Sequence, residues 1–404
     1  MLATPETANA NTGDISRLTK AWLTLRWPLL AFGVSRLLLF IVGGLAQLLF
    51  AEGPGGWHAV PDAPLLDMWA RFDSGFYLNI VRDGYSYILG EQSSVAFFPL
   101  YPLLVKLLTP LGGRVLAGVV VSNLCFLVGL IYLYELTRLE LSETVARKTV
   151  LLLSFFPASF FFSAVYTEST FFVLAVMSFY YARRERWGLA SLAALLASAT
   201  RVVGVLLVLS LGLEWLRSHG LTFATVHKRA AWHSALSGLR QDWASFLCLF
   251  SVPLGILSFM VFLGQNFADP IAFMSVQSAW GRESLGPMLI LQRDITGFFY
   301  GLGIGEVYWQ VPVDVAAWLL GLVCAVGVWR TLGASYALFV LTGLLLPIMS
   351  STQSLTRYLI VLFPVFMILG RWLKRDWLEY SLYALFALGG SVGFALFVNW
   401  HFVA

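Results

Sequence analysis

A polar stretch at residues 52–102 separates long apolar runs, and Asp73 stands near its centre. Aromatic residues flank it, with Phe72 before it and Phe76 and Tyr77 after it. Burial among aromatic rings disfavours the charged form of a carboxylate, which makes it a stronger base than one in water. Asp73 is therefore a candidate general base that would take the proton of a sugar or polyol hydroxyl. An equally good interpretation is that Asp73 caps a short helix beginning at the next residue, since Asp is a favoured N-cap.

A second carboxylate, Glu168, closes an aromatic run at residues 154–169 that carries almost no other charge. Ionisable side chains in such apolar surroundings are costly, so they indicate a functional site by default. The alternative is that Glu168 caps the helix that follows it. We favour the functional interpretation.

Two arginines, Arg201 and Arg357, lie among apolar residues at predicted helix ends. A guanidinium group can hold a phosphate through paired hydrogen bonds, and the alternative for each arginine is contact with lipid headgroups. Residues 277–283, which end in Glu283, add an aromatic ring and polar side chains of the kind that stack on sugar rings and bond to them. The predicted substrate-binding residues are Glu168, Arg201, Arg357, Tyr358, Arg71, Gln277, Trp280 and Arg282.

Several classes of site are excluded by the sequence. It has no glycine-rich phosphate loop, and its five histidines and three cysteines show no metal-ligand spacing, so no metal or cofactor is expected. The cysteines lie within apolar runs and are expected to be packing residues. No polar segment is long enough to hold a Rossmann-type domain, which excludes a nucleotide-sugar enzyme of that kind. We expect no nucleic-acid partner.

The composition is that of an integral membrane protein. Of the 404 residues, 59% are hydrophobic and 12% are charged, with a mean hydropathy of +0.78, whereas a soluble chain carries about 25% charged residues. The apolar runs are long enough to span a membrane as helices and lack the alternation of a β-barrel. The sequence therefore predicts an all-α polytopic bundle in contact with membrane lipids.

About 11 membrane-spanning helices are expected. A break is placed at Arg201, because one uninterrupted helix over 187–216 would put the basic segment that follows it on the wrong side. Residues 288–304 contain Arg293 and Asp294 and are assigned to a long outer loop, and residues 97–111 are assigned to short helices at the membrane interface. The expected spans are 28–50, 115–137, 150–166, 168–182, 188–200, 203–216, 244–264, 313–329, 335–349, 358–370 and 378–400.

Charge distribution orients these spans. With the N-terminus in the cytoplasm, seventeen of the 26 basic residues lie on the cytoplasmic side and twelve of the 22 acidic residues lie on the other, as the positive-inside rule requires. Asp73, Glu168, Arg201 and Arg357 then share the outer face. Residues 1–19 are expected to form a short, poorly ordered tail. No role is assigned to Arg36, the one basic residue well inside a span.

The chain resembles the second mannosyltransferase of glycosylphosphatidylinositol synthesis, the phosphatidylinositol-glycan class V family, and its bacterial relatives. The block around Asp73 followed by Phe-Phe-Pro-Leu-Tyr-Pro is the most specific part of the resemblance. Phe72 stands where the family usually has Trp, a conservative change beside the sugar. The matching pieces, in family order, are residues 71–77, 84–85, 96–102, 157–159, 162–164, 166–169, 201, 357–358 and 363–364.

The resemblance implies a GT-C fold and an inverting glycosyltransferase. Such enzymes move a sugar, typically mannose, from a polyprenyl-phosphate carrier to a lipid-linked or other hydroxyl acceptor on the non-cytoplasmic face. Asp73 would be the general base, Arg201 and Arg357 would bind the donor phosphate, and Glu168 would orient hydroxyls. The compact chain is more similar to bacterial relatives, which implies a plasma-membrane enzyme.

The expected organisation is a cytoplasmic tail and lead-in at residues 1–27 followed by one GT-C transmembrane domain at residues 28–404. That domain includes a first outer loop at 51–114, which holds the catalytic aspartate, and a long outer loop at 265–312. A polytopic transporter or lipid-carrier flippase is the alternative function. It would require inverted repeats and ionisable groups near the membrane midplane, and the sequence shows neither pattern.

Overall fold

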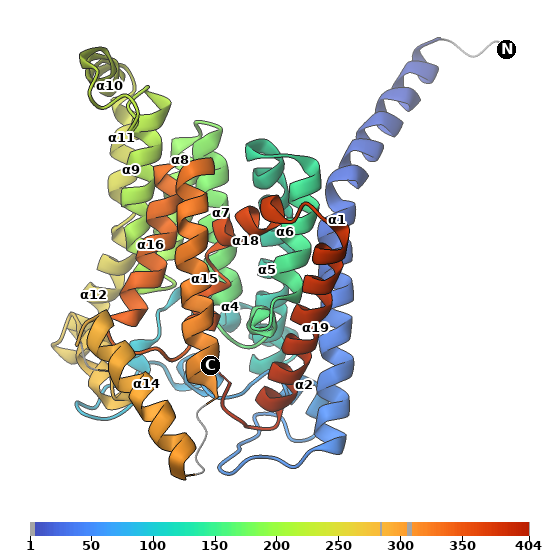
Figure 1. Ribbon diagram of the computed structural model, residues 1–404, viewed down its shortest axis with the longest axis vertical. Helices are drawn as coiled ribbons and strands as arrows, with labels where there is room; N and C mark the ends of the chain where they lie inside the picture. The colour runs from blue at the N-terminus through green and yellow to red at the C-terminus, as the bar shows by residue number, and fades with distance from the viewer. Residues whose placement is uncertain (1–4, 283–284, 305–308, 404) are drawn as a thin grey trace.

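The computed structural model describes residues 5–282, 285–304 and 309–403, and within these ranges the chain is all-helical. Most of the long helices stand side by side in one bundle (Figure 1). In chain order they are α1 (Pro5–Leu49), α2 (Pro64–Asp67), α3 (Ser74–Asp83), α4 (Leu100–Leu108), α5 (Arg114–Glu140), α6 (Glu143–Phe155), α7 (Glu168–Arg183), α8 (Trp187–Ser198), α9 (Leu207–Ser218), α10 (Arg229–Gln241), α11 (Trp243–Cys248), α12 (Leu254–Phe267), α13 (Ala272–Ser275), α14 (Pro287–Ile304), α15 (Gln310–Thr331), α16 (Ala334–Ile348), α17 (Leu355–Leu359), α18 (Phe363–Trp372) and α19 (Asp376–Val398).

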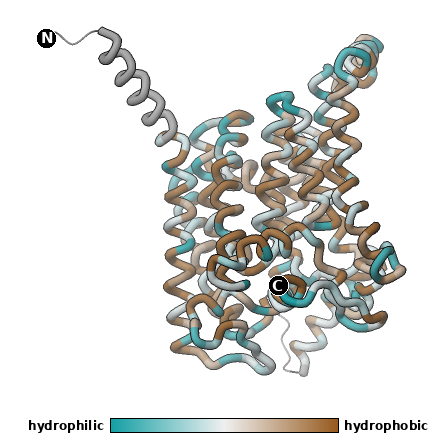
Figure 2. The backbone as a smooth tube through the Cα atoms, turned by 180° about the vertical axis from the view of Figure 1, so that it is seen from behind, coloured by the Kyte–Doolittle hydropathy of each residue, from teal (hydrophilic) through white to brown (hydrophobic). Residues whose placement is uncertain are grey.

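Among the residues that the structure describes, five helical segments are long and apolar enough to cross a membrane. Figure 2 shows a broad hydrophobic band across the bundle, and no more than 44% of any of these windows is buried within the protein. Exposed leucines such as Leu37 and Leu45 on α1 would be unfavourable in water, so lipid must cover them. The five segments are Trp22–Leu49, Arg114–Glu140, Trp243–Phe267, Gln310–Thr331 and Asp376–Val398.

The other six expected spans form shorter or interrupted helices. The run at 150–166 becomes the end of α6 and a 3-10 turn, and the run at 358–370 is divided between α17 and α18. The predicted break at Arg201 is present, because α8 ends at Ser198 and a 3-10 turn begins at Val202. The count of eleven crossings stays a prediction.

Two segments expected to be irregular are helical. The tail expected to be poorly ordered is helical from Pro5 onward and continues α1, because proline is favoured at a first helical position and a lone glycine costs only about 1 kcal/mol. Residues 288–304, assigned to a loop, form α14 at the end of the bundle (Figure 1). Residues 97–111 do form short helices, Leu100–Leu108 and a 3-10 turn at Thr109–Leu111.

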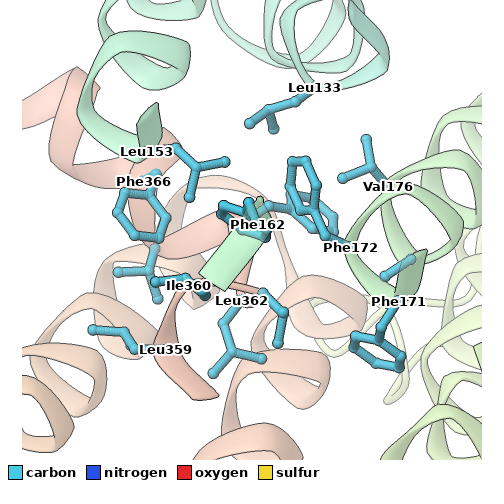
Figure 3. Packing of buried hydrophobic residues seen from close by; sticks show 14 of the residues in the cluster. Leu133, Leu153, Phe162, Phe171, Phe172, Val176, Leu359, Ile360, Leu362 and Phe366 are labelled. Atoms are coloured by element: carbon cyan, nitrogen blue, oxygen red, sulfur yellow. The ribbon is translucent and has the colours of Figure 1, made fainter. Parts of the chain in front are cut away.

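The core of the bundle is largely aromatic. The ring of Phe126 on α5 stacks on Phe162 with centroids 4.5 Å apart, and Phe162 contacts Phe172 on α7 at 5.1 Å. Figure 3 shows Phe162 surrounded by side chains of α5, α6, α7 and the 359–366 segment. This packing fixes residues 156–167, the irregular link between α6 and α7.

Arg36 supplies the hydrogen bonds that this irregular link needs. Its guanidinium donates to the main-chain oxygens of Ser154 and Ser159 and to the hydroxyls of Ser159 and Ser163, at 2.9–3.1 Å. Non-helical backbone inside a membrane protein persists only where its polar groups have internal partners. Arg36 is therefore a structural cation that terminates α6 and holds the start of the turn.

Replacing Arg36 should destabilise the bundle strongly. Arg36→Met would remove four buried hydrogen bonds from a charged donor, and each bond of this kind contributes about 1.5–3 kcal/mol. The matched control is Arg26→Met on the same helix, whose exposed pair with Glu143 at 3.1 Å should contribute about 0–1 kcal/mol. Denaturant titration in detergent micelles measures both. Equal losses for the two variants would contradict this role.

Candidate functional site

Asp73 lies at the turn that starts α3, but it does not cap the helix. Phe72 before it has a φ of 51°, a left-handed conformation that is uncommon for a residue with a large side chain. Asp73 occupies the N-cap position without a side-chain capping bond. Its carboxylate instead accepts a hydrogen bond from Arg357, with Nη1 and Oδ2 2.9 Å apart. The Asp73 side chain is 31% exposed, so it is only partly desolvated. It also makes a direct ion pair, which was not expected from the sequence.

Glu168 is shared by two arginines. Its Oε1 accepts from Arg357 Nε at 2.5 Å and from Arg201 Nη1 at 2.8 Å, and the residue is fully buried. Like Asp73, it makes no capping bond with its helix. Glu168 Oε2 has no hydrogen-bond partner within the described ranges. The pairing joins α7, the break before α9 and α17 at one point.

Tyr166 links this ion-pair group to the Asp73 turn, and the sequence analysis assigned it no role. Its hydroxyl donates to the main-chain oxygen of Arg71 at 3.1 Å and accepts from the N–H of Asp73 at 3.2 Å. The guanidinium of Arg357 lies 4.7 Å from the centroid of its ring, within range of a cation–π contact. Tyr166 therefore sets the position of Asp73 relative to Arg357.

The chain break around Arg201 brings its side chain to the site. The residue is extended, with φ −153° and ψ 146°, between the end of α8 and the following 3-10 turn. A Cβ on Gly204 would lie 2.3 Å from the main-chain oxygen of Ala197, so only glycine permits this close return of the chain. The guanidinium of Arg201 also lies 5.2 Å from the ring centroid of Tyr358.

Two aspartates hold the segment that leads into Arg357. Asp314 on α15 is buried, and its carboxylate accepts from the N–H of Ser354 at 3.1 Å and from the N–H and hydroxyl of Thr356 at 2.7 and 2.6 Å. Asp294 on α14 accepts from the N–H and hydroxyl of Thr352 at 3.1 and 2.6 Å. These bonds fix the start of α17 and therefore the reach of Arg357.

A cavity of about 390 Å³ opens beside these residues. One part of its wall is polar and aromatic, and the other is apolar, formed largely by α16 and the residues just after Arg201. Glu168 lies behind the arginines and does not line it, whereas Glu283 falls outside the described residues. The predicted site residues that line the cavity are Asp73, Arg201, Gln277, Trp280, Arg282, Arg357 and Tyr358.

Arg71 is not brought to this cavity. It is fully buried, and its guanidinium donates to the carboxylate of Asp67 at 2.8 Å and to the main-chain oxygen of Val398 at 2.9 Å. Burial would raise the pKa of Asp67, but hydrogen bonds from the N–H of Val60, from His58 and from Arg71 outweigh it and lower that pKa. Arg71 thus joins the first outer loop to the end of α19.

A family comparison identifies the chain. The family model described as Mannosyltransferase (PIG-V) matches residues 62–325, which is more than half of the sequence and includes Asp73, Glu168 and Arg201. The chain belongs to this family. It is therefore a membrane glycosyltransferase, which removes the transporter alternative. Arg357 and Tyr358 lie beyond the matched range. Among curated protein sequences, none matches this chain significantly.

One of the solved structures that match this member of the mannosyltransferase (PIG-V) family shares its fold. ArnT from Cupriavidus metallidurans, crystallised with undecaprenyl phosphate, is similar over 93% of this chain and 77% of its own, with a TM-score of 0.52 at 12% identity. The oligosaccharyltransferase of Archaeoglobus fulgidus matches 90% of this chain and 52% of its own, with a TM-score of 0.37 at 12% identity. The likeness to ArnT confirms the expected GT-C fold.

Residues that support the site from a distance escaped the sequence analysis of this mannosyltransferase-family protein. Asp314 was counted only among the outer acidic charges, and Asp294 was also used to assign residues 288–304 to a loop, although an aspartate inside an apolar helix is itself a signal of function. Within residues 5–282, 285–304 and 309–403, no three side chains of His, Cys, Asp or Glu gather as a metal site would need. The described site is therefore built from arginines, carboxylates and aromatic rings.

Asp314→Ala should loosen the Arg357 segment locally. Two main-chain N–H groups would lose their acceptor, and each buried donor left unsatisfied costs about 1–3 kcal/mol. Hydrogen exchange of residues 352–357 should therefore accelerate by at least about tenfold, whereas exchange in α5 stays unchanged. Asp376→Ala, at the exposed start of α19, is the control. Unchanged exchange at 352–357 would show that Asp314 does not hold this segment.

Proposed function

We propose that this protein transfers a sugar, mannose, from a polyprenyl-phosphate carrier to a hydroxyl acceptor at the outer face of the membrane, with inversion at the anomeric carbon. The observation that carries the proposal is the cavity in which Asp73 lies with Arg201, Arg282 and Arg357. The family's description supports mannose as the sugar. The crystallised ArnT binds undecaprenyl phosphate, and this supports a polyprenyl carrier here.

The donor phosphate would lie against the arginines. Three cationic side chains face the cavity, whereas Asp73 and the buried Glu168 supply two negative charges, so one positive charge is left over. Arg357 uses only two of its N–H groups in its bonds to the carboxylates, and a guanidinium has five. N–H donors therefore remain for phosphate oxygens without breaking the ion pairs.

The apolar wall of the same cavity suits a prenyl chain. Val202 and Val203 follow Arg201 directly, and Phe339 and Leu346 on α16 also line the cavity. A hydrocarbon tail lying there would replace lipid contacts with protein contacts at little cost, while its phosphate remains at the polar end. The two chemical halves of the donor thus match the two halves of the cavity.

The aromatic part of the wall suits the transferred sugar. Trp280 lies near Phe97 and Phe76, with ring centroids 6.2 and 5.8 Å away. Gln277 accepts a hydrogen bond from Arg282 at 2.8 Å, which fixes the amide at the cavity wall. Flat apolar rings and oriented polar groups together are the usual means of holding a pyranose.

In the transfer step, an acceptor hydroxyl attacks the anomeric carbon from the side opposite to the phosphate. The new bond forms between the acceptor oxygen and that carbon, while the bond from carbon to phosphate oxygen breaks. The leaving polyprenyl phosphate keeps the electron pair, and Arg201 and Arg357 stabilise its charge. Asp73 takes the proton of the acceptor hydroxyl.

Asp73→Asn should abolish the base and keep the fold. A general base contributes about 10²–10⁴-fold to the rate, so kcat should fall by that factor while the KM for donor changes little. Purified protein in lipid nanodiscs, given polyprenyl-phosphate [³H]mannose and an alkyl mannoside acceptor, provides the assay. Asp376→Asn, at the exposed start of α19, is the matched control. Wild-type activity in Asp73→Asn would refute the assignment of the base.

The proposed topology, with a cytoplasmic N-terminus and the site on the outer face, is tested by labelling. A cysteine introduced by Gln92→Cys, in the exposed first outer loop, should react with an impermeant maleimide in intact cells. A cysteine introduced by Ser234→Cys, exposed on α10, should react only after the membrane is opened. The unsubstituted protein gives the background from its own three cysteines. The reverse labelling pattern would invert the proposed topology.

A further inference from the structure

A second cavity lies on the other side of the turn that carries Asp73. Its volume is about 430 Å³. Asp73 lines the first cavity, whereas Phe72 and Phe76, on either side of it in sequence, line the second. The ring of Phe76 stacks on Phe97 of the first cavity, with centroids 4.6 Å apart and an interplanar angle of 16°. Phe76 is therefore part of the partition between the two cavities, beside the carboxylate.

Aromatic rings form one side of the second cavity and are held in place by the end of the chain. Trp57 and Phe72 each lie 5.2 Å from the ring of Trp400. Gly75 on α3 lets Trp57 pack close, because a Cβ there would be 3.0 Å from the indole. The ring faces are therefore fixed before any ligand arrives.

Polar and cationic groups form the other side. Asn79 and Arg82 project from α3, Arg114 begins α5, and His58 comes from the first outer loop. Arg82 is paired with Asp83 at 2.7 Å. Arg114 donates to the main-chain oxygen of Leu78 at 2.9 Å and has no carboxylate partner among the residues that the structure describes. This side therefore offers an uncompensated guanidinium next to an amide and an imidazole.

We infer that the second cavity binds an acceptor glycan that carries an anionic group, such as a sugar phosphate. Fixed rings would stack on the pyranose faces, Asn79 would bond to a hydroxyl, and Arg114 would pair with the anion. Both ring nitrogens of His58 are already bonded, to Asp67 and Glu52, so the imidazole only shapes the wall. The bound glycan would reach past Phe76 and present the hydroxyl of its last sugar to Asp73. The inference rests on the proposed transfer reaction and names the class of its acceptor.

The chemistry of the lining disfavours other occupants. A prenyl or acyl chain gains nothing from an amide, an imidazole and two guanidinium groups, and it already has the apolar wall of the first cavity. A lipid phosphate headgroup would use the arginines but not the rings. A phosphorylated sugar uses both sides, so the test must separate it from a phosphate alone.

Three probes make that separation in the purified full-length protein in nanodiscs: octyl α-mannoside, its 6-phosphate, and octyl phosphate. Equilibrium binding, measured with undecaprenyl phosphate saturating the first cavity, should rank the mannoside 6-phosphate about tenfold tighter than either of the others, since charge-assisted bonds and ring contacts each contribute. Equal binding of octyl phosphate and the mannoside 6-phosphate would mean a headgroup site and would overturn the inference.

Variants then locate the site. Trp57→Ala should weaken both mannosides about tenfold, whereas Arg114→Gln should weaken only the phosphorylated one. Trp377→Ala and Arg229→Gln, which change exposed residues outside the second cavity, are the matched controls. Thermal unfolding checks each variant. If Trp57→Ala fails to fold, Asn79→Ala, on the exposed face of α3, replaces it.

Transfer kinetics separate this inference from the proposed function. If the wild-type protein transfers mannose, its kinetics can be compared with those of the variants. Trp57→Ala and Arg114→Gln should each raise the KM for the phosphorylated acceptor about tenfold and leave the KM for donor unchanged. An unchanged acceptor KM in both variants would overturn the acceptor site while the transfer reaction stands. Absence of any transfer by the wild type would refute the proposed function itself, and with it the acceptor role of a cavity that still binds the probes.

Discussion

One buried carboxylate, shared by two guanidinium groups, determines how the site is assembled. Glu168 Oε1 lies 2.8 Å from Arg201 and 2.5 Å from Arg357, and Arg357 extends on to Asp73 at 2.9 Å. Removing one partner of a buried pair leaves an unpaired charge and costs about 3–5 kcal/mol. The four residues come from four separate parts of the chain, so each ion pair can form only when the segments that carry its two members have come together. Assembly of the site and of this part of the bundle is therefore one event.

The site also depends on hydrogen-bond partners for the backbone groups at the ends of interrupted helices. Each charged residue of the site lies where a helix begins or breaks, and backbone groups at such points need partners inside an apolar protein. Arg36 supplies them for the α6–α7 link, and Asp314 supplies them for the start of α17. Neither residue lines the cavity. Their charged side chains form hydrogen bonds with main-chain groups, and these bonds fix the positions of Glu168 and Arg357.

Much of this arrangement was predictable from sequence, because breaks in apolar runs are local signals. The interruption at Arg201 and the polar turn at Asp73 both follow from charge or glycine within an apolar context. What could not be predicted was the partner of each charge. Arg71 is two residues from Asp73, yet it turns to the end of α19, because Asp67 lies one helical turn before it.

The role of α14 shows a different limit. The pair Arg293 and Asp294 in a moderately apolar segment predicted a loop. In the helix, however, both charged side chains have partners: Arg293 donates to Asp294 at 2.8 Å, and Asp294 also accepts a hydrogen bond from Thr352. That second bond joins residues 58 positions apart, a contact that no local pattern contains.

The pairing of Asp73 with Arg357 bears on how the carboxylate would act as a base. Arg357 Nη1 lies 2.9 Å from Asp73 Oδ2 and holds the carboxylate in position. Phosphate is a good leaving group, so carbon–oxygen bond breaking can run ahead of nucleophilic attack. The acceptor hydroxyl then becomes acidic as its oxygen bonds to the electron-poor carbon, and a weak base suffices at that point. A carboxylate held in position by a cation therefore fits a reaction in which departure of the phosphate supplies most of the driving force.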